Sequence, residues 1–399
     1  MFVRGKHLFN SIYKRKQYLC PNNDIHYLAR EIDEWLTVGV ASLKAGVYNP
    51  RHLTRYYFKN EMVEQFHISD RILQNILLAQ LKPTLSHIVN PNCLHIYGPS
   101  GVKIATKRIQ GALNSQSFNY VIRADIKSYY KSVQHHILIE DIKINFDDKK
   151  VISMLTNIIK NPIDTPWGTK NPDHGLPLRG PLSQLFSALY LKPLDDAFNN
   201  ADVEYLRYQD DIIILCKTKR QLNRCKQKMM HILHQRRLLL SRKKSRIGLV
   251  SGGFHFLGVS YLEPQPQDKI NANSFLGVKN KISVGKVCLA KQAKNAIKAH
   301  PHSRTFRKAR EQVKSMVTYG FDTQSIRSYL SLWCSWWSNS VDNWSYQKML
   351  EWFVNTTHQE CVQLIAKALL DEYKITLQSM SKAALGQEAA LVQETPEVR

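Results

Sequence analysis

The chain has 399 residues, 43% of them hydrophobic, which is enough for a sizeable core and two or three domains. Lysine and arginine outnumber aspartate and glutamate by 56 to 32, and this net charge of +24 favours a polyanionic partner such as nucleic acid over a generic basic surface. The seven cysteines form no Cys-x-x-Cys pair, and neither an apolar run of about 18 residues nor a secretory signal is evident, so we expect a cytoplasmic protein with no membrane segment.

The first part of the chain, residues 1 to about 115, has mainly helical patterns. The clearest is amphipathic over 70–81, with Ser69 or Asp70 as a candidate N-cap and Pro83 just past the expected end. A turn at 48–51 leads into a short extended stretch around 55–58.

The middle of the chain mixes strands and helices. Residues 119–126 and 254–261 alternate as strands, and 162–175 is a loop rich in turn residues. Helices are expected over 136–160, 183–198 and 221–240, and again through the basic, tryptophan-rich stretch 286–375. The last twenty or so residues are small, polar and acidic, which is typical of a disordered tail.

Two adjacent carboxylates interrupt a pair of apolar strand patterns in the sequence Tyr208-Gln209-Asp210-Asp211. Aspartate is a poor strand residue and costly to bury, so the pair calls for a compensating charge such as a divalent cation. The simpler alternative is a surface hairpin whose turn happens to contain these residues.

A third carboxylate, Asp125, ends the apolar strand over 119–126. If the two strands are neighbours, Asp125, Asp210 and Asp211 converge at one rim of a sheet. Three carboxylates can hold two Mg²⁺ ions roughly 3.5–4 Å apart, which is the arrangement for in-line phosphoryl displacement. Taken alone, Asp125 is equally well explained as a cap of the following helix.

Five elements in the order found in reverse transcriptases make the chain resemble that family. Asp125 is followed by an aromatic residue at Tyr130, and 175–191 is similar to the template-and-nucleotide element of the family. The Tyr208–Asp211 motif comes next, 238–245 is similar to the Lys-Thr element, and Phe256-Leu257-Gly258 is similar to the primer grip.

The resemblance implies roles for individual residues. Asp125, Asp210 and Asp211 would be catalytic and hold Mg²⁺, or Mn²⁺ in its place, with Ile126 as a further ligand position. Nucleotide contacts would come from Tyr130 as a steric gate against ribonucleotides, from Lys244 near the pyrophosphate, and from Arg55 and Leu178. Primer and template contacts would come from Gly180, Ser183, Gln184, Tyr208, Phe256, Leu257 and Gly258. Without the family context, Tyr130 is equally well a core aromatic residue.

The chain departs from the family pattern at Leu178-Arg179, where many relatives have Gln-Gly after the proline. A glutamine side chain would hydrogen-bond near the nucleotide sugar, and Leu178 cannot. Nucleotide selection is therefore expected to differ from that of relatives, and Arg179 is a candidate for a phosphate or template contact.

The resemblance implies an α+β right-hand polymerase, with fingers and a palm built on a small antiparallel sheet, plus an α-helical thumb. The expected divisions are 1–115 for the N-terminal region and fingers, 116–270 for the palm with a fingers insertion near 140–180, 271–375 for the thumb, and 376–399 for the tail. Basic residues along 217–228 and 286–310 fit a duplex-binding surface, although solvated helix faces explain about half of them. Five tryptophans between Trp333 and Trp352 are better explained by helix packing than by base stacking.

Short strings at 95–103 and 244–258 resemble the stand-alone bacterial enzymes once called unknown-group reverse transcriptases, nearest to the type 3 defence-associated systems. That resemblance implies anti-phage defence, dNTP substrates, a DNA product, a dedicated non-coding RNA, and a second reverse transcriptase subunit or a second copy of the chain. Two alternatives stay open: a retroelement enzyme of the retron, diversity-generating or intron kind, and a non-catalytic RNA-binding scaffold.

Overall fold

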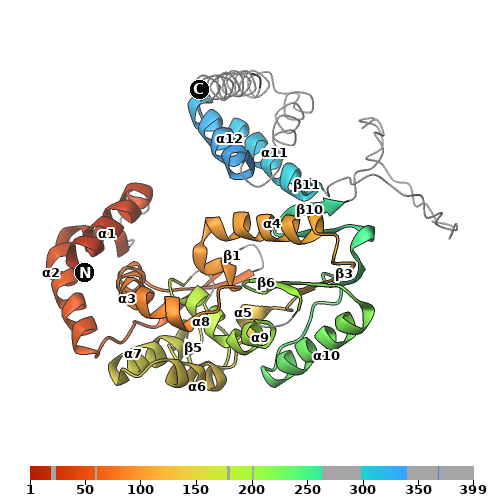
Figure 1. Ribbon diagram of the computed structural model, residues 1–399. Coiled ribbons are helices and arrows are strands. Elements are labelled where there is room, and N and C mark those ends of the chain that lie inside the picture. The colour runs from red at the N-terminus through yellow and green to blue at the C-terminus, as the bar shows by residue number, and fades with distance from the viewer. Residues whose placement is uncertain are drawn as a thin grey trace, which may run out of the picture. The chain divides into compact units, whose positions relative to one another are not determined.

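The computed structural model describes residues 1–18, 24–58, 61–177, 180–199, 202–262, 298–338 and 367. The chain divides into two compact units (Figure 1). Unit 1 comprises Met1–Val102 and Phe118–Gly248, and unit 2 comprises Lys103–Ser117 and the chain from Leu249 onward. Within the described residues, no helix combines the length and apolar character needed to cross a bilayer.

Three helices, α1 (Phe2–Lys16), α2 (Asp24–Ala45) and α3 (Ile68–Ile88), pack together at the start of unit 1 (Figure 1). The helix expected over 70–81 is present but longer: it begins at Ile68 after His67, so Ser69 and Asp70 are not its N-cap. It also continues past Pro83, because Leu81 and Leu85 on either side are buried in the core.

The first sheet of unit 1 has the strand order β2-β1-β4-β5. Strand β1 (Leu53–Phe58) pairs antiparallel with β2 (Glu61–Gln65) and parallel with β4 (Ile163–Thr165). Strand β5 (Gly168–Lys170) completes a hairpin with β4. The turn-rich stretch 162–175 is therefore partly a hairpin and joins the extended stretch expected around 55–58.

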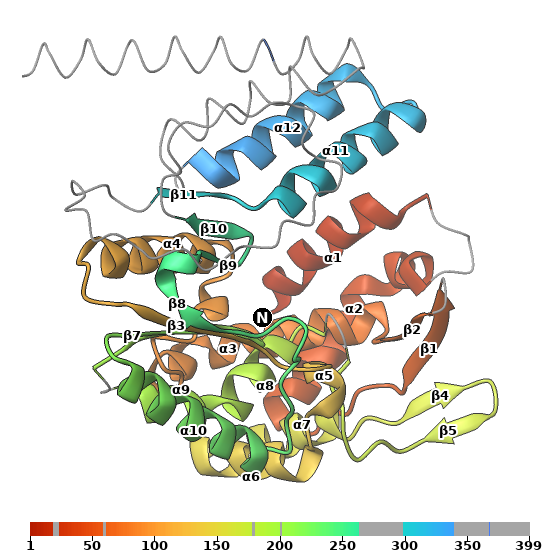
Figure 2. The same cartoon turned by 90° about the vertical axis from the view of Figure 1, so that its right-hand side faces the viewer.

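The second sheet carries the carboxylates and has the order β6-β7-β3-β8. Its strands are β3 (Tyr120–Asp125), β6 (Glu204–Tyr208), β7 (Asp211–Cys216) and β8 (Arg246–Leu249). The strand expected over 119–126 is confirmed. Helix α10 (Lys219–Gln235) contacts β3 and β7 (Figure 2) and buries Leu222, Cys225, Met229 and Leu233.

Three helices expected in the middle of the chain are divided or shortened. The stretch 136–160 forms α6 (His135–Asn145) and α7 (Lys149–Ile159), separated where the Asp148 side chain caps α7 by accepting the Lys150 N–H. The stretch 183–198 forms α8 (Ser183–Tyr190) and α9 (Lys192–Phe198), with Pro193 in the first turn of α9, where its missing N–H is tolerated. Helix α10 ends before Arg237, whose φ is 53°.

Unit 2 contains most of α4 (Pro99–Asn114), a short 3-10 turn η2 (Val250–Gly252), a three-stranded antiparallel sheet β11-β10-β9, and two further helices. Its strands are β9 (Phe254–Phe256), β10 (Val259–Leu262) and β11 (Lys298–Pro301). Helices α11 (Ser303–Thr318) and α12 (Thr323–Ser338) contact each other and bury Ala309, Val313, Met316, Ile326 and Leu330.

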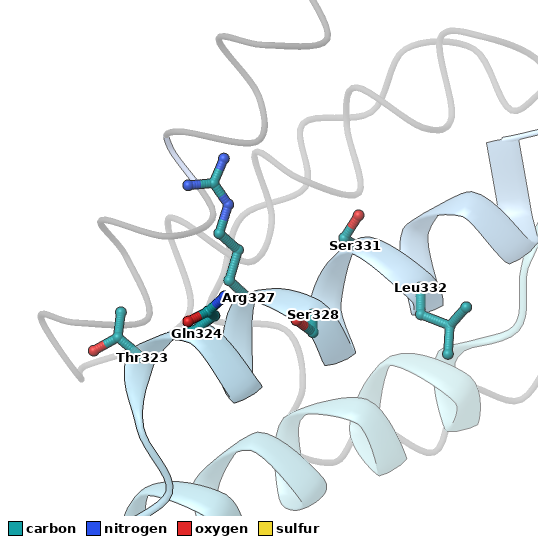
Figure 3. A pocket seen from close by; sticks show the side chains of 6 residues that line it. All are labelled: Thr323, Gln324, Arg327, Ser328, Ser331 and Leu332. Atoms are coloured by element: carbon teal, nitrogen blue, oxygen red, sulfur yellow. The ribbon is translucent and has the colours of Figure 1, made fainter.

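One side of α12 borders a hollow (Figure 3), and its described lining residues all come from that helix: Thr323, Gln324, Arg327, Ser328, Ser331 and Leu332. Side chains from a single helix do not enclose a ligand, so this hollow supports no functional assignment. Trp333 is half-buried on α12, whereas Trp344 and Trp352 lie outside the described residues.

The fold class expected from the sequence is confirmed in its general form, because the described residues mix helices with small, mostly antiparallel sheets. The two compact units exchange at Val102, at Ser117 and at Gly248, and of these only Ser117 lies near an expected functional division, the one at 115. Those divisions stay a prediction, and the tail 376–399 and all of 271–297 lie outside the described residues.

Candidate active site

The hairpin of β6 and β7 presents two aspartates at its tip. Tyr208 pairs with Asp211 across the hairpin, which leaves Gln209 and Asp210 as a two-residue turn. Gln209 has a φ of 54°, in the left-handed region that costs a non-glycine residue about 1–2 kcal/mol. Strand β7 behind the turn is almost wholly buried, so Asp210 and Asp211 are held at a fixed edge of the sheet.

Strand β3 brings the third carboxylate beside them. Asp125 lies directly opposite Asp211 in the antiparallel β3–β7 register. Just past it, the Ile126 N–H donates to the carbonyl of Asp210 at 3.4 Å. Cross-strand partners have side chains on the same face roughly 4.5–5.5 Å apart, and like charges there destabilise the pair. The arrangement expected from the sequence, with three carboxylates at one rim, is therefore present.

Burial and the charges of neighbouring carboxylates raise the pKa values of Asp210 and Asp211. Burial, followed by the charge of Asp210, raises the pKa of Asp211 to about 6, while Arg123 acts in the opposite direction. Burial and then the charge of Asp125 also raise the pKa of Asp210, which Lys244 partly offsets. A cation bound between these groups would relieve both shifts.

The donor set fits a hard divalent cation. Asp125 is 6% exposed, and its Oδ2 is buried with no hydrogen-bond partner. No group of three or more His, Cys, Asp or Glu side chains forms a ready-made metal cage anywhere among the described residues. Carboxylate oxygens are the ligands that Mg²⁺ prefers, and substrate phosphates and water usually complete its shell.

The segment that carries Lys244 is hydrogen-bonded to the end of β3. The Lys127 N–H donates to the carbonyl of Leu239, the Ser241 N–H donates to the carbonyl of Asp125, and the Asp125 N–H donates to Ser245 Oγ. As a result Lys244 Nζ lies 3.2 Å from Asp125 Oδ1, with most of its side chain in solvent. The ammonium group of Lys244 thus lies beside the carboxylates.

Tyr130 follows the β3 strand on the short helix α5 (Tyr129–Ser132). Its ring meets Tyr129 edge-on, with centroids 5.5 Å apart. Burial and then the charge of Asp210 raise the pKa of Tyr130 to about 12, so its phenol stays neutral near the carboxylates. The structure places this ring next to the site but does not test its role as a steric gate.

The loop before α8 is fixed by its own backbone and side chains. Ser183 is buried and its Oγ donates to the carbonyl of Pro177 at 2.8 Å, so this hydroxyl is already used. A Cβ on Gly180 would lie 2.6 Å from Ser183 Oγ and 3.1 Å from the Phe66 ring, which explains the glycine by packing. The Gln184 side chain is exposed, and its contact with primer or template stays a prediction. Leu178 and Arg179 lie outside the described residues.

Arg55 lines a cavity of about 290 Å³ between the first sheet and the loop Gly175–Pro177. Its guanidinium donates to Glu64 at 2.6 Å, and Lys131 and Lys170 also border the space. None of the three carboxylates lines this cavity. Arg55 therefore lies at a separate cavity of unit 1 whose charged lining is mixed, with Glu64 and Asp173 beside the three cations, and its nucleotide contact stays a prediction.

The expected primer-grip residues lie in unit 2. The stretch 254–261, which the alternation predicted as one strand, is a hairpin in which Phe256 pairs with Val259. Leu257 and Gly258 form its two-residue turn, and both have positive φ, 49° and 81°. The alternation could not show this because the two strands are short and their turn falls within the pattern. The structure thus places a tight turn at Leu257–Gly258, whereas the contact of Phe256–Gly258 with a primer stays a prediction.

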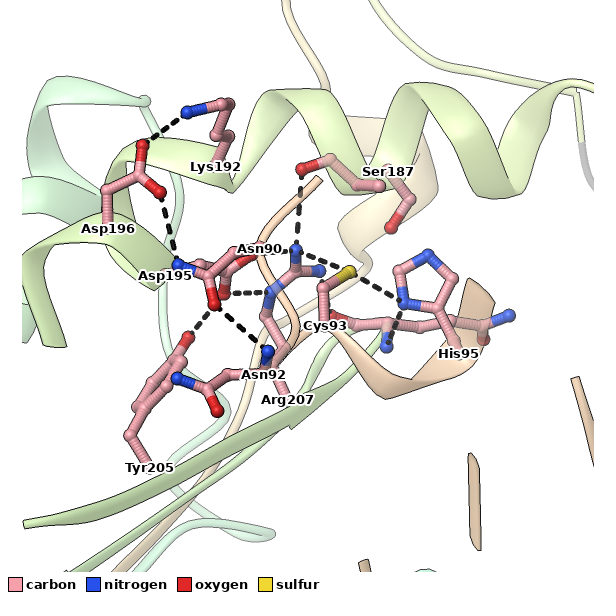
Figure 4. A network of polar contacts seen from close by, with 12 residues as sticks. Asn90, Asn92, Cys93, His95, Ser187, Lys192, Asp195, Asp196, Tyr205 and Arg207 are labelled. Carbon is pink, nitrogen blue, oxygen red and sulfur yellow. Dashed lines mark hydrogen bonds and ion pairs between the residues drawn. The ribbon is translucent and has the colours of Figure 1, made fainter. Parts of the chain in front are cut away.

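Sequence reasoning missed a buried polar cluster directly behind the aspartate hairpin (Figure 4). Arg207 and Asp195 are both 0% exposed and paired, with Arg207 Nε donating to Asp195 Oδ1 at 2.7 Å. Tyr205 also donates to Asp195, and His95 lies beside Cys93 in the same cluster. The available signal was an arginine inside the apolar β6 pattern, where a buried charge needs a partner.

The sequence matches the family described as reverse transcriptase (RNA-dependent DNA polymerase) over residues 61–261, just over half of the chain. The match contains the three carboxylates, Tyr130, Lys244 and the hairpin at Phe256–Gly258. Protein YkfC of Escherichia coli (strain K12) is 24% identical over 263 residues, which cover 54% of this chain and 68% of that protein. The chain belongs to the reverse transcriptase family.

Proposed function

We propose that the chain is an RNA-directed DNA polymerase that extends a DNA strand with deoxynucleoside triphosphates. The observation that carries the proposal is the β3–β7 register, which sets Asp125 opposite Asp211 with Asp210 in the adjoining turn. A protein that only binds RNA has no need for three acids at a site where phosphates must approach.

Asp125, Asp210 and Asp211 would hold Mg²⁺, with Ile126 as a neighbouring backbone position. Mg²⁺ bound there would make the primer 3′-hydroxyl a better nucleophile and neutralise the leaving pyrophosphate. Lys244 Nζ, already 3.2 Å from Asp125, would counter phosphate charge or supply a proton to the pyrophosphate.

Tyr130 would restrict the space around the sugar and thereby exclude a ribose 2′-hydroxyl. Gln184 and Tyr208 would lie along the primer and template, and Arg55, Lys131 and Lys170 would offer cations to phosphates at the cavity beside the first sheet. Unit 1 would supply fingers and palm, and α11 and α12 would serve as the thumb. Five cations on α11 are exposed and would meet duplex phosphates: Arg304, Arg307, Lys308, Arg310 and Lys314.

The proposal is tested by extending a labelled DNA primer on an RNA template with Mg²⁺ and dNTPs. Asp210→Asn is expected to abolish extension. Asp202→Asn is the matched control, because Asp202 is exposed and only pairs with Lys217 at the surface. Full extension by the Asp210→Asn protein would remove the catalytic assignment.

For the biological role, we propose anti-phage defence with a dedicated non-coding RNA, with a second reverse transcriptase or a second copy of the chain as partner. The support is the resemblance of 95–103 and 244–258 to the defence-associated enzymes. Sequencing the nucleic acid that copurifies with the full chain tests this proposal. A single recurrent RNA supports it, random RNA counts against it, and a template repeat encoded beside the gene would favour a retroelement enzyme.

A further inference from the structure

The turn that presents Asp210 needs support from outside the hairpin. Gln209 adopts a φ of 54° in a two-residue turn, where glycine is the usual residue. An unsupported turn of this kind would sample other conformations, and Asp210 would move with it. Displacement of a reacting group by about 1 Å can cost on the order of 100-fold in rate.

Both backbone polar groups of Gln209 are held by buried side chains. Its N–H donates to His95 Nδ1 at 3.1 Å, and its carbonyl accepts from Arg207 Nη1 at 3.0 Å. His95 and Arg207 are both 0% exposed, whereas Gln209 itself is partly exposed. The turn is therefore supported from two sides by side chains that are held inside the protein.

The protonation state of His95 follows from its partners. Because Nδ1 accepts the Gln209 N–H, the ring proton must be on Nε2, which donates to the carbonyl of Gln184 at 3.0 Å. Burial and then the charge of Arg207 lower the pKa of His95 to about 3, so the ring stays neutral. One neutral imidazole thus connects the Gln209–Asp210 turn to the first turn of α8.

Arg207 holds the other side of the turn and is itself fixed. Asp195 binds two of its nitrogens, and Asn92 accepts the Arg207 backbone N–H at 2.9 Å. Cys93 Sγ lies 3.1 Å from Arg207 Nη2 and 3.4 Å from His95 Nδ1, and its thiol therefore joins the two supports (Figure 4). These bonds connect the two supports of the turn to each other.

We propose that His95 is a positioning residue for polymerisation: it holds the Gln209–Asp210 turn at a fixed distance from α8 and so sets Asp210 against the bound template and nucleotide. This inference rests on the proposed polymerase function. It assigns His95 no contact with substrate. Loss of the His95 side chain is expected to slow the chemical step and to leave nucleotide affinity unchanged.

Two substitutions separate the two bonds of the imidazole. In His95→Asn, the side-chain oxygen stands where Nδ1 was and can still accept the Gln209 N–H, but the bond to Gln184 is lost. In His95→Gln, the amide nitrogen reaches the position of Nε2 and keeps the bond to Gln184, but the Gln209 N–H loses its acceptor. Each variant keeps one bond of the pair, so a general loss of packing affects both alike.

The experiment measures single-nucleotide extension and hydrogen exchange on the full chain. His95→Gln is expected to lower kcat on the order of 10–100-fold with little change in the KM for dNTP, and His95→Asn is expected to retain most of kcat. The Gln209 amide should exchange faster in His95→Gln only, which is measurable even without polymerase activity. Equal kcat and equal exchange in the two variants, or a larger effect in His95→Asn, would overturn the proposal. A wild-type chain that does not polymerise would defeat the polymerase assignment, and the exchange measurement would still decide the role of His95.

Discussion

The buried pair of Arg207 and Asp195 predicts a large loss of stability when one charge is removed. Asp195 takes two donors of the guanidinium, at 2.7 Å and 2.5 Å, and neither side chain has any exposed surface. Asp195→Asn keeps the shape of the side chain but leaves the arginine charge buried without a counter-ion. Removing one partner from a buried pair costs about 3–5 kcal/mol. Because folded proteins are stable by only about 5–15 kcal/mol, this is a large share of the total.

The neighbouring residue offers the control. Asp196 is on the same helix, pairs with Lys192 and has a side chain 47% exposed, so Asp196→Asn should cost about 0–1 kcal/mol. Urea unfolding followed by circular dichroism compares the two midpoints. If Asp195→Asn shifts the midpoint no more than Asp196→Asn does, the pair does not hold the fold in the way its burial indicates.

A double substitution then separates folding from function. Replacing both charges with apolar residues, as in Asp195→Leu with Arg207→Met, should recover most of the stability because no unpaired charge remains. Primer extension by this protein should still be impaired, since Arg207 Nη1 no longer supports the Gln209 carbonyl. A stable double variant with normal activity would show that the turn needs no such donor.

Three further predictions concern the site itself. The folded-state pKa of Asp211, about 6, lies above that of an unfolded aspartate, near 3.9, so the contribution of Asp211 to stability is present at low pH and is lost as the pH rises through 6. In thermal unfolding without Mg²⁺, the Asp211→Asn protein should therefore gain stability relative to wild type between pH 4.5 and 7.5. A constant difference between the two proteins across that range would contradict the assignment. In a primer-extension competition, Tyr130→Ala should raise the ratio of ribonucleotide to deoxyribonucleotide incorporation on the order of 10–100-fold. Tyr130→Phe keeps the ring and should leave this ratio unchanged. Equal ratios in the two variants would rule out the steric gate. Gly180→Ala should lower the free energy of unfolding, measured in urea, by about 1–3 kcal/mol because the new methyl group would lie 2.6 Å from Ser183 Oγ. Adding Ser183→Ala should recover part of that loss. Gly248→Ala is the control, because its methyl group would meet nothing within 4 Å.

The parts of the site that sequence reasoning anticipated depend on short-range patterns. Asp125 ends one apolar strand and Asp210-Asp211 interrupt another, and strands of this kind pair in a sheet because each must bury its apolar face. Alternation alone could not give the register. That Asp125 faces Asp211, and not a residue one place along, depends on which faces of β3 and β7 are buried, including the packing of α10 on both strands, because a slip of one residue would turn every side chain to the other face.

Helix boundaries were harder to predict for a related reason. The apolar pattern continues through Leu191, but Pro193 and the burial of Leu194 and Phe198 divide the stretch into α8 and α9. In α3, the same pattern stops before Pro83, and tertiary contacts of Leu85 carry the helix past it. In both helices the packing partners, which lie far away in the sequence, decide the outcome.

The cluster behind the turn shows why a site is more than its reacting groups. His95 is separated from Gln209 by 114 positions in the chain, and Arg207 contacts Asp195 only because α9 and β6 pack together. No local pattern connects these residues, since each alone is an isolated polar side chain in an apolar segment. Physically they are required together: a turn with positive φ at a non-glycine residue stays in place only when the surrounding structure determines it. In the proposed function the aspartates would carry the chemistry, and the precision with which Asp210 is presented would depend on the buried groups behind the turn.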